Sequence, residues 1–95
     1  MALWCTFYKS IRDPSALAAY AALAVPALAA GGGQFVARGM PTAVFEAGLK
    51  ERTVIIKFES VEAAVSCYNS VAYKKALAAL GDGAERDLRI VECVA

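Results

Sequence analysis

Residues 52–68 decide the fold of this chain, and they read RTVIIKFESVEAAVSCY. The first part of this segment is rich in β-branched residues that alternate between two sides, which predicts a strand over residues 52–58. The side chains of Val54, Ile56 and Phe58 are expected together on one side of this strand. Ser60 can then cap a helix, which the sequence predicts over residues 61–68.

The chain that follows this segment adds a second helical piece and a strand. Asn69 and Ser70 predict a break in the helix, and the Ser70 side chain can cap a new helical piece that ends near residue 80. The Gly-Asp-Gly sequence of residues 81–83 predicts a loop. Residues 88–94 predict the last strand.

The N-terminal part of the chain predicts a matching unit. Residues 3–11 alternate and are rich in aromatic side chains, which predicts the first strand. Asp13 can cap a helix over residues 14–30, whose first position is a proline. Pro26 lies inside this helix and is expected to kink or divide it near Ala22.

The middle of the chain connects the two units. The glycines at 31–33 end the predicted helix. Residues 34–39 predict the second strand, which is expected to resume over residues 43–46 as a bent extension. Residues 48–51 then predict a turn that leads into the third strand.

The predicted elements follow the order strand, helix, strand, strand, helix, strand. Right-handed crossovers place both helices on one face of a four-stranded antiparallel sheet. This is the α+β, ferredoxin-like arrangement β-α-β-β-α-β, built from residues 3–39 and 53–94. A chain of 95 residues has the size of one domain, 1–95.

Both faces of this sheet are expected to be apolar. The alternating sets of the first strand are Leu3, Cys5 and Phe7 on one side and Trp4, Thr6 and Tyr8 on the other. Ile55 and Val91 likewise oppose the main apolar sets of their strands. One face packs on the helices, and the other needs a second cover. We therefore expect a homodimer in which two sheets face each other as a dimeric α/β barrel. Trp4 is expected in the dimer core, and the lining of a pocket is the alternative.

Composition excludes several classes of protein. A formal charge of +1 gives no electrostatic footprint for nucleic acid or for a membrane surface, so neither is an expected partner. The three cysteines are far apart and histidine is absent, which excludes a usual zinc site and a histidine-ligated haem. We expect no metal, no cofactor and free thiols, as in a cytoplasmic protein.

The alanine-rich run of residues 16–30 is similar to the apolar core of a signal peptide. Asp13 and Pro14 precede this run and indicate the start of a helix instead. Removal of the run would also discard the first strand and helix of the predicted domain. The run is too short to span a bilayer, so we expect a cytoplasmic domain.

An ordered set of residues along the chain carries a resemblance to a known family. The set is Asp13-Pro14, Tyr20, Gly32-Gly33-x-Phe35, Arg38-Gly39, Glu46, Arg52-x-Val54-Ile55-Ile56-x-Phe58, Ser60-x-Glu62-x-Ala64, Tyr68-x-Ser70-x-x-Tyr73 and Ile90-Val91-Glu92. Over nearly its whole length the chain resembles the bacterial domain-of-unknown-function family thirteen-thirty, of the dimeric α/β-barrel superfamily. The resemblance implies a ferredoxin-like fold and a homodimer with facing sheets, and it implies no established reaction.

Arg38 is the first candidate for a binding residue. It ends a predicted strand just before a glycine, where a guanidinium can clamp a carboxylate through two hydrogen bonds. The alternative is an ion pair between Arg38 and Glu46 or another acid. Glu46 is itself a candidate base, although Glu46 and Arg52 flank the predicted turn and can simply pair across it.

Three tyrosines, Tyr20, Tyr68 and Tyr73, lie on the predicted helices. Aromatic residues at helical spacing usually belong to the core. The hydroxyl groups of buried tyrosines still need partners, so these residues can also line a polar spot in an apolar pocket. No catalytic residue can be assigned from the sequence.

Two classes of function are consistent with these features. The first is a small enzyme or binding protein that holds a small apolar or carboxylated metabolite in a pocket between helices and sheet. The second is a non-catalytic dimeric module for structure or interaction. A pocket with converging arginine and tyrosine side chains favours the first, and a filled interior favours the second.

Overall fold

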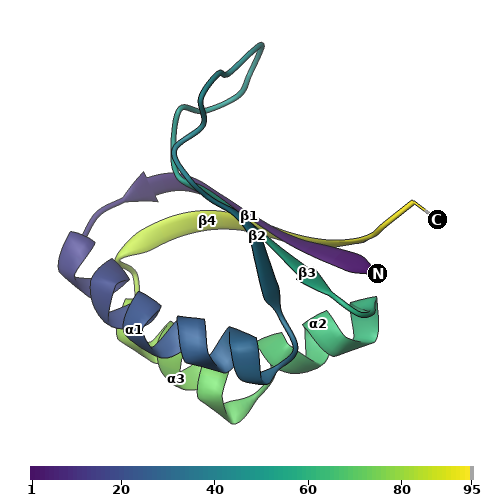
Figure 1. The fold of residues 1–95 in the computed structure, drawn as a ribbon. Coiled ribbons are helices and arrows are strands. Elements are labelled where there is room, and N and C mark those ends of the chain that lie inside the picture. The colour runs from purple at the N-terminus through teal and green to yellow at the C-terminus, as the bar shows by residue number, and fades with distance from the viewer. Residues whose placement is uncertain (95) are drawn as a thin grey trace.

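The computed structural model describes residues 1–94. Its elements in chain order are β1 (Ala2–Ile11), α1 (Pro14–Ala30), β2 (Gln34–Gly39), β3 (Thr53–Phe58), α2 (Val61–Tyr68), α3 (Val71–Leu80) and β4 (Ala84–Glu92). The strands form one antiparallel sheet in the order β2-β3-β1-β4. All helices cover one face of this sheet (Figure 1). The predicted ferredoxin-like α+β fold is confirmed.

The helices begin at the residues that the sequence predicts. The Asp13 carboxylate accepts hydrogen bonds from the backbone N–H groups of the first turn of α1. The Ser60 and Ser70 hydroxyls cap α2 and α3 in the same way. Tyr68 ends α2 and Val71 begins α3, so the predicted break between them is confirmed.

Three predicted boundaries are wrong. Helix α1 is not divided at Pro26, because Pro26 and Ala22 both lie on its exposed side, where water can hydrate the carbonyl that Pro26 cannot bond. Residues 43–46 form no strand, since they belong to a loop without a neighbouring strand to pair with. Strand β4 begins at Ala84 and not near residue 88, because Ala84 already pairs with Ile11 of β1.

The core lies between the sheet and the helices. Trp4 is fully buried there, and its ring packs against those of Phe58, Tyr68 and Tyr73. The indole N–H of Trp4 donates to the Thr6 hydroxyl at 2.9 Å, which satisfies both buried polar groups. The expectation that Trp4 belongs to a dimer core is therefore wrong, because the chain's own helices cover it.

The other face of the sheet carries no helix (Figure 1). Its apolar side chains include those of Leu3, Cys5, Phe7, Ile55 and Val91. Val91 lies opposite Leu3 and is 54% exposed. We call this surface the open face. An ion pair between Arg89 and Asp87, at 2.7 Å, also lies on it, and Lys57 lies opposite Leu3, so charged side chains are interspersed with the apolar ones.

The three cysteines are free. Cys5 and Cys93 are not direct cross-strand neighbours. Cys5 lies opposite Arg89, whereas the backbone N–H of Cys93 donates to the carbonyl of Met1. This register keeps the two thiols several residues apart along the strands.

The connection from β2 to β3 is a loop over residues 40–52 that projects away from the sheet on the side without helices (Figure 1). Its exposed apolar side chains are those of Met40, Val44, Phe45 and Leu49. Arg38 and Arg52 lie at the two ends of the loop. The loop therefore begins and ends beside the same part of the sheet.

Candidate functional site

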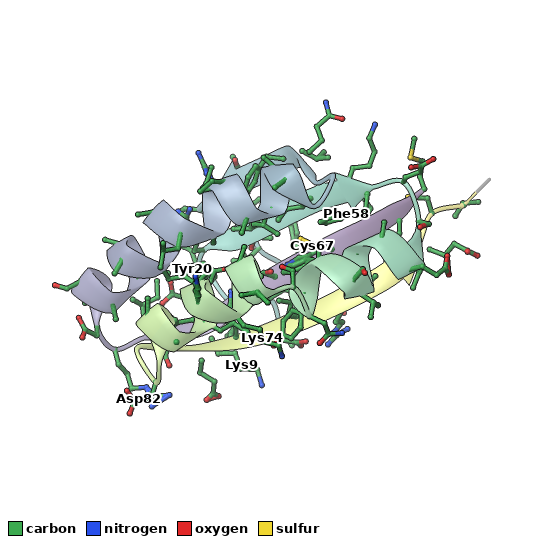
Figure 2. The ribbon with its side chains drawn as sticks, turned by 90° about the horizontal axis from the view of Figure 1, so that it is seen from below. Lys9, Tyr20, Phe58, Cys67, Lys74 and Asp82 are labelled. Atoms are coloured by element: carbon green, nitrogen blue, oxygen red, sulfur yellow. The ribbon has the colours of Figure 1, made fainter. Side chains whose placement is uncertain are left out.

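A pocket lies between α1 and the helix-facing side of the sheet. Its volume is about 460 Å³, including the open mouth. The α1 residues that line it are Leu17, Tyr20, Ala21, Ala24, Val25 and Leu28. In Figure 2, which views the molecule from the helix side, Tyr20 lies between α1 and α3. A pocket of this size suits a small molecule.

One end of the pocket floor is apolar. Trp4, Ile56 and Phe35 lie side by side there on β1, β3 and β2. The Leu28 side chain covers this end from α1. The residues of this end offer few polar groups, because the indole N–H of Trp4 already donates to Thr6.

The other end of the pocket floor is cationic. Tyr8 lies opposite Arg86 of β4, and on its other side the backbone N–H of Tyr8 donates to the carbonyl of Arg52. These three residues therefore form one row across the sheet. Arg38 lies opposite Val54, one row nearer the apolar end. All three arginines line the pocket.

Arg86 holds a group of tyrosine hydroxyls together. Its Nη1 donates to the Tyr20 hydroxyl at 3.0 Å, and the Tyr20 and Tyr73 hydroxyl oxygens are 2.6 Å apart. The guanidinium carbon also lies 4.8 Å from the centre of the Tyr20 ring and 5.8 Å from that of Tyr8. The Tyr20 side chain therefore links the cationic end of the pocket to the buried core.

Burial and neighbouring groups determine the protonation states of Arg86, Tyr73 and Tyr8. Burial alone lowers the pKa of Arg86, but the neighbouring Tyr20 and Tyr73 hydroxyls raise it above its ordinary value, so the guanidinium stays charged. Burial also raises the pKa of Tyr73 and, despite the opposing effect of Arg86, the pKa of Tyr8. Both hydroxyls therefore keep their protons at neutral pH.

The raised pKa of Tyr73 predicts that the protein loses stability in alkali. Above about pH 10 the unfolded chain releases this proton while the folded chain retains it. The contribution of Tyr73 to the free energy of unfolding is thus fully present below about pH 10. Above that pH the free energy of unfolding falls by up to about 1.4 kcal/mol per pH unit. Urea unfolding followed by circular dichroism at several alkaline pH values measures this fall.

The Tyr73→Phe variant is the control for this effect. It removes the hydroxyl and keeps the ring that packs against Trp4. Its free energy of unfolding is expected to fall less steeply with alkaline pH than that of the wild-type protein. Equal slopes for the two proteins would show that Tyr73 is not the group that titrates.

No carboxylate lines the pocket. Within residues 1–94 the single ion pair is that of Arg89 and Asp87 on the open face. The predicted pairs of Glu46 with Arg38 and with Arg52 are therefore wrong. The Arg38 guanidinium instead lies 4.9 Å from the centre of the Phe35 ring.

The predicted site residues separate into two groups. Arg38 and Tyr20 line the pocket, and Tyr73 contacts Tyr20 from behind through their hydroxyls. Tyr68 lies away from the pocket, where its ring packs on Trp4 and faces the Lys74 ammonium. Glu46 is exposed on the projecting loop and does not line the pocket.

Sequence reasoning missed Arg86 and Tyr8 as pocket residues, and it considered Arg52 only as a hairpin partner. The predicted last strand begins at residue 88, so Arg86 lies outside it. The alternation of Leu88 and Ile90, extended back by one step, puts Arg86 on the same face. Prediction of a longer last strand would therefore have identified Arg86 as a candidate.

Residues 1–94 hold no group of three histidine, cysteine or acidic side chains arranged for a metal ion. In that same part of the chain, none of the helices combines the length and the apolar character needed to cross a bilayer.

The fold and pocket define a class of small α+β protein with a cleft between its first helix and its sheet. The model of the family described as Domain of unknown function (DUF1330) matches residues 1–94, so the chain belongs to that family. The resemblance seen in the sequence is thereby confirmed. No curated protein matches the chain.

Solved structures share the fold. One is the methylated RPA0582 protein, with a TM-score of 0.74 and 17% identity over 99% of this chain and 81% of the other. A second structure of RPA0582, described as a protein of unknown function from Rhodopseudomonas palustris, gives the same score and identity over 99% and 83%. Protein Atu4242 from Agrobacterium tumefaciens has a TM-score of 0.66 and 16% identity over 99% and 94%. At these identities the likeness concerns the fold alone.

Proposed function

We propose that the protein binds or converts a small, largely apolar or carboxylated molecule in the pocket beneath α1. The observation that carries this proposal is the pocket itself, with apolar walls and a few converging polar side chains at one end. This combination is the usual form of a small-molecule site. Of the two classes weighed from the sequence, a binding protein or small enzyme is the better supported.

A pocket-filling variant tests this proposal. Ala21 lines the pocket from α1, so an Ala21→Leu side chain is expected to occupy part of the space and weaken ligand binding at least about tenfold. Binding of benzyl alcohol and benzoate, small aromatic molecules without and with a charge, is measured from shifts in the protein's NMR spectrum.

The matched control is Ala22→Leu, which adds the same side chain one residue later, on the exposed side of α1. It is expected to bind both probes as the wild-type protein does. If neither probe binds the wild-type protein, or if Ala21→Leu binds them unchanged, the pocket is not a ligand site.

We also propose that the protein is a homodimer whose open faces pack together. Exposed Val91 and Phe7, together with half-buried Leu3 and Ile55, support this arrangement, because water would otherwise contact an apolar sheet surface. The same observation favours the second candidate function, a non-catalytic dimeric module. The free thiols support a cytoplasmic location in a bacterial cell.

A further inference from the structure

We infer that the cationic end of the pocket binds the carboxylate of a small organic monoacid whose apolar body lies over Trp4 and Ile56. This inference rests on the proposed function and names its ligand class. Arg86 is the principal recognition residue, with Arg52 and Arg38 at the same end of the pocket.

The first argument is the charge of the pocket without a ligand. Three guanidinium groups line a cleft in which no carboxylate is present. Arg86 and Arg52 are partly buried, and neither belongs to an ion pair within the described residues 1–94. Partial removal of a guanidinium from water costs free energy when no opposite charge lies beside it. A bound anionic ligand supplies that opposite charge and offsets the cost.

The second argument is the supply of hydrogen-bond donors. A guanidinium has five N–H groups, and the Tyr20 hydroxyl accepts from one nitrogen of Arg86. Its other hydrogen-bonding partners are also tyrosine hydroxyls, those of Tyr73 and Tyr8, and none is a carboxylate. The planar N–H groups of a guanidinium match the two oxygens of a carboxylate. Tyr8 lies opposite Arg86 and lines the same end of the pocket, so its protonated hydroxyl is a further donor.

The third argument is the difference between the two ends. A carboxylate at the row of Arg52, Tyr8 and Arg86 leaves the rest of the ligand over Ile56 and Trp4, beneath Leu28. The walls of that apolar end would remove water from a second carboxylate and offer it no hydrogen bonds in return, which is costly. The ligand class is therefore an aromatic or branched aliphatic acid with one carboxylate, and a dicarboxylate is disfavoured.

A purely structural role for Arg86 is the competing explanation. Its position over the Tyr20 ring and its hydrogen bond to that hydroxyl both stabilise the fold without any ligand. If Arg86 had only a structural role, the affinity of the pocket for a molecule would not depend on the charge of that molecule. The ratio of affinities for a charged and a neutral ligand of the same shape separates the two explanations.

The experiment compares benzoate with benzamide, which has the same shape and no charge, by NMR titration of the full chain. The wild-type protein is expected to bind benzoate at least about tenfold more tightly. In Arg86→Gln this preference is expected to fall to about one, with benzamide affinity little changed. Arg89→Gln, on the open face, is the control and is expected to keep the preference.

A second variant keeps the test decisive if Arg86→Gln does not fold. Arg52→Gln changes the other arginine of the same row and is expected to reduce the preference several-fold. Equal binding of benzoate and benzamide by the wild-type protein overturns this inference and leaves the proposed function intact. Preference for terephthalate, which carries a second carboxylate, over benzoate would overturn the assignment to monoacids. Failure of both probes to bind overturns the proposed function as well.

Discussion

A single aspartate in place of Val91 is expected to convert the protein from a dimer into a folded monomer. Val91 lies on the open face opposite Leu3, so in the proposed dimer it is buried against the second copy. A twofold axis brings the new carboxylate into the interface twice. Burial of two unpaired charges is expected to weaken association at least about 100-fold.

The monomer is expected to stay folded. The buried core of each chain lies on the opposite side of the sheet and is complete without a partner. Light scattering at micromolar concentration measures the change, from twice the chain mass of 10.0 kDa to that mass alone. Circular dichroism reports whether the fold is retained.

Ala78→Asp is the matched control, because Ala78 is exposed on α3, on the other side of the molecule. This variant is expected to remain dimeric. A wild-type protein that is already monomeric at micromolar concentration would rule out the proposed dimer. A dimeric Val91→Asp protein would show that the copies associate through another surface.

Replacement of Trp4 by alanine is expected to remove a large part of the free energy of unfolding of the chain. Trp4 is 1% exposed, and its ring contacts Phe58, Tyr68 and Tyr73. Removal of a buried tryptophan costs about 3–5 kcal/mol. A domain of this size has a free energy of unfolding of about 5–10 kcal/mol, so the variant is expected to keep only part of it and to unfold at a much lower urea concentration.

The measurement is urea unfolding followed by circular dichroism, since Trp4 is the chain's one tryptophan and fluorescence is lost with it. Phe45→Ala serves as the comparison, because it removes an aromatic ring that is 79% exposed on the projecting loop. It is expected to change the free energy of unfolding by less than about 0.5 kcal/mol. A Trp4→Ala protein with near wild-type stability would mean that this aromatic cluster contributes little.

Local sequence signals were sufficient to predict most of the fold. The caps at Asp13, Ser60 and Ser70 each begin a helix, because a side-chain oxygen there meets backbone N–H groups that have no other partner. Alternation likewise predicted β3, with Val54, Ile56 and Phe58 on one side of it. The errors arose where the outcome depends on distant residues, as at Ala84, whose pairing with Ile11 extends β4.

The candidate site was only partly predictable for the same reason. The proximity of Tyr20 and Tyr73 arises because α1 and α3 lie side by side, and no spacing in the sequence reports that distance. Arg86 joins them through the pairing of β4 with β1. Arg38 was identified because it ends a strand before a glycine, which is a local signal.

The strand order has a consequence for how the molecule forms. In the sheet β2-β3-β1-β4, every pair of neighbouring strands joins one strand from before the projecting loop to one from after it. Neither half of the chain can therefore complete a single strand pair of the native sheet by itself. Folding must wait until both halves are present, and contacts between residues far apart in the sequence set its rate. The molecule is thus one cooperative unit, despite its repeated β-α-β plan.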